Sequence, residues 1–153
     1  MNTIILNKLK YIKNKLKNHQ DSVLFADMNE GIETNLFKDE NNLLEYRSFI
    51  QFCNGARFGD IDLWGVEEIL ENQFYLKEHI DVLVCIGQIL YEPIIVNKAN
   101  GNIYLFDYDN NTIRYDIEFG SFNNFINEFI FGVGYEEIIP DIQSDEWYNF
   151  LKK

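Results

Sequence analysis

The stretch Tyr46–Glu68, YRSFIQFCNGARFGDIDLWGVEE, decides the fold that we expect for this chain. It reads as the end of a helix, a stop at Asn54-Gly55, a short strand and a corner at Trp64-Gly65. Asn and Gly suit a helix end because Gly adopts the left-handed conformation without a Cβ clash, and Asn tolerates it better than most residues. The helix should therefore stop there and the chain should reverse.

The strand within this stretch alternates between polar and apolar residues. Side chains of a strand point to opposite faces in turn, so Ile61 and Leu63 share one face while Asp60, Asp62 and Trp64 share the other. Two acids beside an aromatic ring on an outer face favour a surface that a partner contacts.

Helical spacing predicts three helices in the N-terminal half. In residues 3–18, apolar side chains recur at intervals of four, three and four (Ile5, Leu9, Ile12 and Leu16). A second helix over 41–53 leads into Asn54-Gly55, and a short third one follows Trp64-Gly65 at 66–70. We expect 21–37 to be loop with a strand or turn, and 72–79 to be a polar link.

The C-terminal half changes to the period of strands. Apolar or alternating runs at 82–86, 93–96, 102–107 and 112–117 predict four more strands, and Asn100-Gly101 is a strong hairpin signal. Ser121 should cap a helix with an aromatic stripe that Gly132 halts, and a terminal helix should start at Ser144. The prediction for residues 1–153 is one α+β domain: an antiparallel, twisted meander of about four to six strands, packed with helices from the N-terminal half and the C-terminus.

Composition bounds the class of protein. The 153 residues are 46% hydrophobic and 16% aromatic, which excludes a disordered chain. Cys53 and Cys85 lie in apolar contexts, so we expect buried thiols in a reducing compartment rather than a disulfide. No apolar run approaches the roughly 18 residues of a membrane span, and lysines interrupt any signal peptide, so we expect a cytoplasmic protein without a membrane partner.

Charge is unevenly distributed along the chain, whose net charge is −12. Residues 1–20 hold five lysines and no acid, whereas residues 21–151 hold six basic and 25 acidic residues, a net charge of −19. Because residues 21–151 are strongly acidic, we expect this part of the protein to repel nucleic acid and to attract basic proteins. The lysine-rich first helix is either an arm for anionic membrane or nucleic acid, or a solvated face laid against the acidic body; we favour the second interpretation.

Two acidic strings resemble catalytic or metal sites. Asp107-x-Asp109-x-Asn111, with Glu118 at the twelfth position, has the oxygen-ligand spacing of a calcium loop, but Thr112 stands where that loop requires Gly. A polar hairpin tip explains the string better. Glu67-Glu68-Glu71 could be paired acid–base carboxylates, yet a solvated acidic face is the simpler interpretation.

No local signature of catalysis accompanies these strings. The two His residues, His19 and His79, lie far apart in the sequence, and no Cys stands at a zinc-ligand spacing from either of them. Phosphate-binding and dinucleotide-binding loops are also missing from the sequence. We therefore expect no enzyme activity, no cofactor and no metal.

The order of short motifs resembles the SUKH superfamily, which includes the Smi and Knr fungal cell-wall regulators and many bacterial immunity proteins. The motifs are Tyr46-x-x-Phe49-Ile50-x-x-Cys53-Asn54-Gly55, Phe58-Gly59, Ile61-Asp62-Leu63, Trp64-Gly65, Ile86-Gly87, a strand-turn-strand over 94–107, and Ser121-Phe122-x-x-Phe125. Two departures stand out: residues 36–39 lack the family's Leu-Pro, and Ala56 replaces a second Gly.

The resemblance implies an immunity protein that binds and neutralises a cognate toxin, often a nuclease, without catalysis. The alternatives are a regulatory or scaffold module that binds an endogenous partner, and a small enzyme or calcium-responsive domain that uses residues 107–118. For the first, we predict that aromatic anchors and acidic steering groups form part of the toxin-binding surface. They are Asp60, Asp62, Trp64, Glu67, Glu68, Tyr108 and Asp109. The alternative is that these residues are only solvated surface and that Trp64 belongs to the core.

Overall fold

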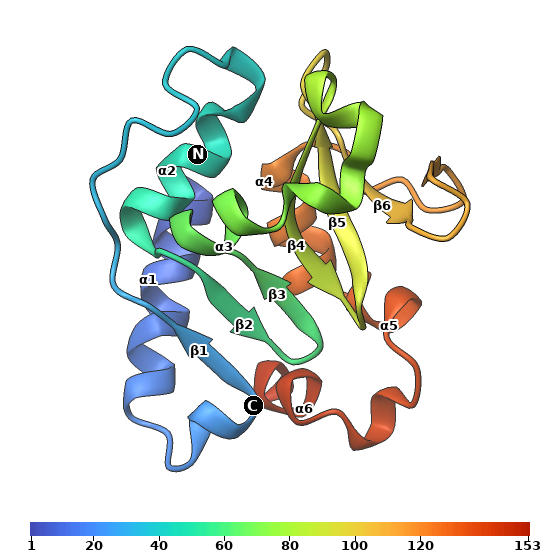
Figure 1. Ribbon diagram of the computed structural model, residues 1–153. Coiled ribbons are helices and arrows are strands. Elements are labelled where there is room, and N and C mark those ends of the chain that lie inside the picture. Colours follow the sequence, from blue (N-terminus) through green and yellow to red (C-terminus); the bar gives the residue numbers. More distant parts are fainter.

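The computed structural model describes residues 1–153 and is built around one antiparallel sheet (Figure 1). Its seven strands lie side by side in the order in which they occur in the chain. The strands are β1 (Ala26–Met28), β2 (Ala56–Phe58), β3 (Ile61–Leu63), β4 (Leu83–Ile89), β5 (Glu92–Asn97), β6 (Ile103–Asp107) and β7 (Thr112–Arg114). The predicted α+β meander is confirmed, with one strand more than the expected upper number.

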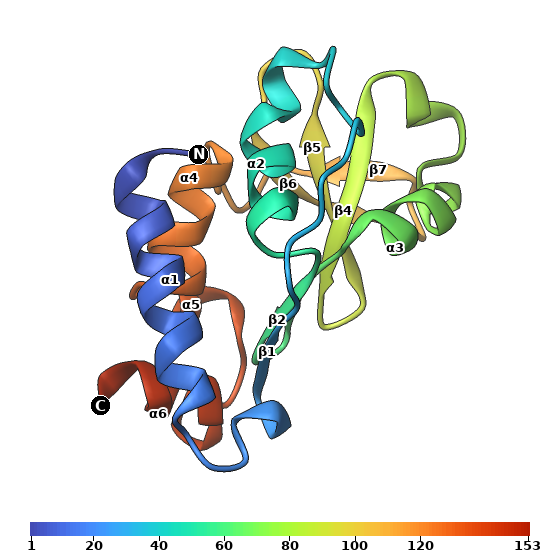
Figure 2. The ribbon, with the colours of Figure 1, turned by 90° about the vertical axis from the view of Figure 1, so that its left-hand side faces the viewer.

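Helices cover both faces of this sheet (Figure 2). The α-helices are α1 (Thr3–Lys17), α2 (Leu44–Phe52), α3 (Val66–Glu71), α4 (Phe122–Asn124), α5 (Tyr135–Ile138) and α6 (Glu146–Lys152). A π-helix, Phe125–Ile130, continues α4, and short 3-10 segments occupy Ser22–Leu24, Asn41–Leu43, Gln73–Asp81 and Ile142–Ser144. We call the face under α1, α2, α4 and α6 the inner face, and the face that carries α3 the outer face.

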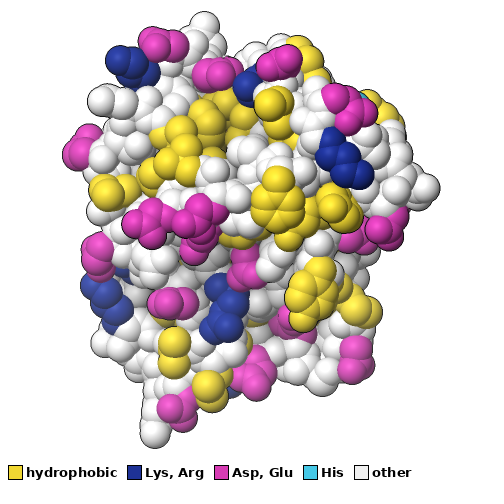
Figure 3. Space-filling model, in the orientation of Figure 1, with side chains coloured by type: hydrophobic (Ala, Val, Ile, Leu, Met, Phe, Trp, Pro, Cys, Tyr) yellow, Lys and Arg dark blue, Asp and Glu magenta, His cyan; other side chains and the backbone are white.

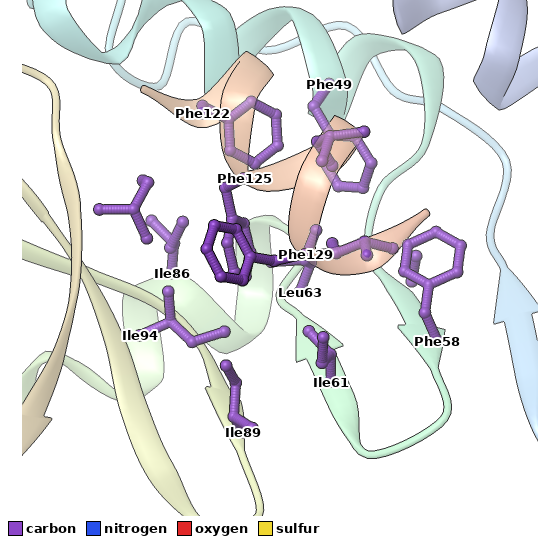
Figure 4. Packing of buried hydrophobic residues seen from close by; sticks show 14 of the residues in the cluster. Phe49, Phe58, Ile61, Leu63, Ile86, Ile89, Ile94, Phe122, Phe125 and Phe129 are labelled. Atoms are coloured by element: carbon purple, nitrogen blue, oxygen red, sulfur yellow. The ribbon is translucent and has the colours of Figure 1, made fainter. Parts of the chain in front are cut away.

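The core lies between the inner face and its helices. The predicted stripe of α1 is buried, as Ile5, Leu9, Ile12 and Leu16 are each at most 6% exposed. Figure 4 shows aromatic rings from α2 and from the helix after Ser121 packed over aliphatic side chains of the sheet. In all, 40 buried apolar residues form a single cluster.

The Asn54-Gly55 turn ends the second helix as predicted. Gly55 has a φ of +94°, and a Cβ there would lie 3.0 Å from the backbone nitrogen of Gly65. The Asn54 side chain accepts a hydrogen bond from the backbone of Val66 at 2.9 Å. The turn therefore also fixes the start of α3, which follows β2 and β3 in the chain.

Three C-terminal features differ from the sequence prediction. The helix capped by Ser121 widens into a π-helix, in which the Phe131 amide donates to the carbonyl of Ile126 at 3.0 Å. The terminal helix starts two residues later than expected, because the carboxylate of Asp145 caps it by accepting from the Tyr148 amide at 2.8 Å. The last strand ends at Arg114 rather than at residue 117.

The lysine-rich face of α1 contacts the body of the protein. Lys13 forms an ion pair with Glu30 at 3.1 Å, and Lys8 donates to the side chain of Asn127 at 2.9 Å. Both cysteines are free and buried, as predicted. No helix has the length and apolar character needed to cross a membrane.

Candidate functional site

A shallow concavity of about 430 Å³ lies on the outer face over β1, β2 and β3. Its floor is a row of polar side chains at directly opposed positions, since Asp27 pairs with Arg57 and Arg57 with Asp62. Beyond the concavity, the row continues onto β4, where Gln88 pairs with Asp62. Because side chains alternate along a strand, the residues on either side of each of these point to the inner face. The concavity is also lined by Asn29, Trp64 and Glu68.

The charges in this row are only partly compensated. The Arg57 guanidinium donates to the carbonyl of Val23, and its Nε has no partner. It forms no ion pair with either of its acidic neighbours on the adjacent strands. Asp62 accepts one hydrogen bond, from the Gln88 side chain at 3.0 Å. The carboxylates of Asp27 and Asp62 therefore remain open to cationic groups of a ligand.

The two adjacent glutamates at the start of α3 have different roles. The Glu68 carboxylate accepts a hydrogen bond from the Gly65 amide at 2.8 Å and so satisfies a free donor at the helix start. Glu67 is exposed and forms no ion pair within the chain. Glu68 thus has a structural function, and Glu67 is the one free to contact a partner.

Trp64 corrects the expectation of an exposed aromatic anchor. Its edge lines the concavity, but the residue is only 8% exposed and belongs to the core cluster. The cause is the segment Gln73–Asp81, which forms 3-10 turns over the outer face and places the ring of Tyr75 against Trp64. The centroids of these two rings are 6.4 Å apart and the ring planes differ by 27°.

Exposed aromatic rings continue from Tyr75 along this face. Its ring stacks on Phe74 at 4.3 Å and meets Tyr108 edge-on at 5.4 Å. Phe74 is 59% exposed and Tyr108 is 43% exposed. We call Phe74, Tyr75 and Tyr108 the aromatic ridge. Figure 3 looks onto the outer face and shows hydrophobic and acidic side chains interspersed across it, together with some Lys and Arg side chains.

The predicted residues thus fall into separate groups. Asp62, Trp64 and Glu68 line one concavity, whereas Tyr108 and Asp109 line another, of about 460 Å³. Asp60 lies apart, in the turn between β2 and β3.

Asp60 has its own acidic surroundings. It lines a third concavity, of about 360 Å³, together with Asp145. Partial burial raises the pKa of the Asp60 carboxyl, and the nearby carboxylates of Asp145 and Asp62 raise it further.

The calcium-like string forms a hairpin tip. The Asp107 carboxylate accepts from the backbone and the side chain of Asn110, at 3.0 and 2.7 Å, and Asn111 donates to Glu78 at 2.7 Å. Hydrogen bonds lower the pKa of both carboxyl groups. The main cause is the Asn110 side chain for Asp107, whereas for Glu78 it is a hydrogen bond from the backbone amide of Glu78, followed by the Asn111 side chain. No group of three or more His, Cys, Asp or Glu side chains is arranged to hold a metal ion.

Sequence reasoning missed Asp27, Arg57 and the ridge residues Phe74 and Tyr75. The first two lie on strands of three residues, too short to show an alternating pattern. Adjacent aromatic residues in the otherwise polar run after α3 were the available signal for the ridge. As a whole, the outer face offers carboxylates and aromatic rings, the groups that bind Lys and Arg side chains.

Comparison with protein-family models and with curated proteins finds no match for this chain.

Proposed function

We propose that this chain is an immunity protein of the SUKH type, which binds a cognate toxin in the cytoplasm and neutralises it without catalysis. The observation that carries the proposal is the outer face, where open carboxylates and exposed aromatic rings lie next to each other. Such a face suits a protein partner with a basic surface, because aromatic rings supply most of the contact energy while charges steer the encounter.

The distribution of charge supports a basic partner. The helix α1, which carries five lysines, lies on the helical side of the molecule (Figure 2), and residues 21–151 carry a net charge of −19. A nuclease that binds the phosphate backbone needs a basic cleft. An acidic face that fills this cleft excludes the nucleic acid, so inhibition requires only tight binding and no chemical step.

The fixed geometry of the outer face also supports binding. Glu68 and Asn54 hold the start of α3 by side-chain hydrogen bonds of 2.8 and 2.9 Å. Gln73 anchors the ridge segment to β4 through two hydrogen bonds with the backbone of Cys85, at 2.7 and 2.9 Å. A surface fixed before binding loses less conformational entropy when the complex forms.

The test is rescue of growth from the toxin encoded beside this gene. Cells that express the toxin domain should grow only when this chain is co-expressed, and an inactivated toxin domain should form a stable complex with it. A toxin that kills despite co-expression would contradict the proposal. A gene without a toxin neighbour would favour the alternative, a regulatory module for an endogenous partner.

A charge reversal tests whether the acidic face makes the contact. Glu67→Lys should slow association and weaken binding by about three- to tenfold, most strongly at low salt. Glu137→Lys is the matched control, because both residues are exposed and lie in the first turn of a short helix. Equal effects of the two variants would indicate that net charge matters and that the outer face does not.

A further inference from the structure

The hairpin between β4 and β5 has an unusual tip. Two residues, Leu90 and Tyr91, connect the paired ends Ile89 and Glu92. Their φ angles are +50° and +79°, in the left-handed region that residues other than Gly and Asn adopt only at an energetic cost. Two-residue hairpins with positive φ at both positions strongly prefer Asn-Gly. The fold alone would therefore favour a different pair of residues.

Packing does not compensate for this strain. Tyr91 is 88% exposed and Leu90 is 40% exposed, so neither side chain is held in the core. What fixes the turn is its backbone, because the Leu90 amide donates to the carbonyl of Asp60 at 3.2 Å. Asn-Gly would keep this hydrogen bond and relieve the strain.

The surroundings of the tip are acidic. Leu90 and Tyr91 line the concavity of about 460 Å³ that also contains Tyr108 of the aromatic ridge. Glu92, Asp107 and Asp109 lie around it. Its one basic residue is Arg114, whose guanidinium is held by Glu92 at 2.5 Å and by Asp116 at 2.6 Å. These two hydrogen bonds raise the pKa of Arg114, and its charge is neutralised within the chain.

We propose that the Leu90–Tyr91 tip is the anchor of the toxin-binding surface and inserts into an apolar pocket that Lys and Arg side chains surround. The proposal rests on the proposed function for the class of partner. Strain at exposed apolar residues is typical of positions selected for contact. The acids around the tip then meet the basic rim while the tyrosine ring fills the pocket.

The test measures stability and affinity on the same variants, with the inactivated toxin domain from the neighbouring gene as the probe in calorimetry. Tyr91→Ala should lower the affinity at least about tenfold. The double variant Leu90→Asn/Tyr91→Gly should lower it as much while raising the melting temperature. Tyr11→Ala is the matched control, since Tyr11 is a 63% exposed tyrosine on α1, and it should change the affinity less than about twofold.

The outcomes separate this inference from the proposed function. If the wild-type chain neither binds the toxin domain nor restores growth, both fail. If it does both and Tyr91→Ala binds equally well, only the anchor is refuted. A lower melting temperature for the double variant would refute the strain argument on which the anchor depends. If the wild type sediments as a dimer and Tyr91→Ala sediments as a monomer, then the tip binds a second copy of this chain and not the toxin.

Discussion

Replacing Gln73 should destabilise the protein, because its side-chain amide ties the ridge segment to α3 and β4. The Gln73 amide donates to the carbonyls of Ile69 at 2.8 Å and of Cys85 at 2.7 Å, and accepts from the Cys85 amide at 2.9 Å. A net contribution of about 1 kcal/mol per hydrogen bond gives a loss of roughly 3 kcal/mol for Gln73→Met, which keeps the length of the side chain. For a chain of this size, that lowers the melting temperature by about 6–12 °C.

Gln73→Glu makes the reasoning testable through pH. The introduced carboxylate turns two donor contacts into repulsive contacts with carbonyl oxygens, so we expect a larger loss at pH 7 than with Gln73→Met. Protonation restores one donor, which raises the pKa of the introduced group in the folded state above its ordinary value of about 4.3. The folded state of the variant then binds more protons, so its loss of stability relative to the wild type is smallest below about pH 4 and grows as pH rises through the raised pKa.

Urea unfolding followed by tryptophan fluorescence measures these effects. Gln88→Met serves as the control, because Gln88 makes a single side-chain hydrogen bond, to Asp62 on the outer face, and its loss should cost about 1 kcal/mol or less. If Gln73→Met loses no more stability than Gln88→Met, or if Gln73→Glu follows the pH dependence of the wild type, then the amide does not anchor the ridge segment.

Three further predictions concern the interior. Tyr46→Phe should cost about 1–3 kcal/mol in urea unfolding, because the fully buried hydroxyl lies 2.6 and 3.0 Å from two backbone carbonyl oxygens that the variant leaves without this donor. Burial raises the pKa of the Cys53 and Cys85 thiols to about 12, so the free energy of unfolding should fall above pH 9 by about 1.4 kcal/mol per pH unit for each thiol, and Cys→Ala at either position should reduce that slope. Gly87→Ala should cost about 3 kcal/mol in the same assay, since a Cβ there would lie 2.0 Å from the backbone oxygen of Asp62; a neutral result would refute the close approach of β3 and β4.

The sequence predicted those elements whose signal is local. The spacing in α1, the stop at Asn54-Gly55 and the strand at 61–63 depend on neighbours in the chain, and all three were found. The sequence did not decide between an exposed and a buried Trp64, because the covering ring comes from Tyr75 on a segment that reads as a polar link.

The parts of the site that the sequence did not predict also depend on contacts between segments distant in the chain. The row across β1, β2 and β3 depends on register between strands of three residues each. Leu90 and Tyr91 form a hairpin turn without the Gly, Asn or Pro that usually marks such a turn, so the sequence gives no local signal for it. A turn of this kind becomes visible only when the two strands are seen to pair.

The residues that carry the family resemblance have structural functions. The Tyr46 hydroxyl contacts two backbone carbonyl groups, Asn54 fixes the start of α3, and Gly87 permits the close approach of two strands. Each of these residues has its function within the chain itself, so proteins of the same fold can have the same residues and still bind unrelated partners. Specificity must then come from side chains that the fold does not need, and Tyr91 and Phe74 fit this description because both are aromatic and mostly exposed. A variant that leaves stability unchanged or improved and loses binding is therefore the most informative kind for this protein.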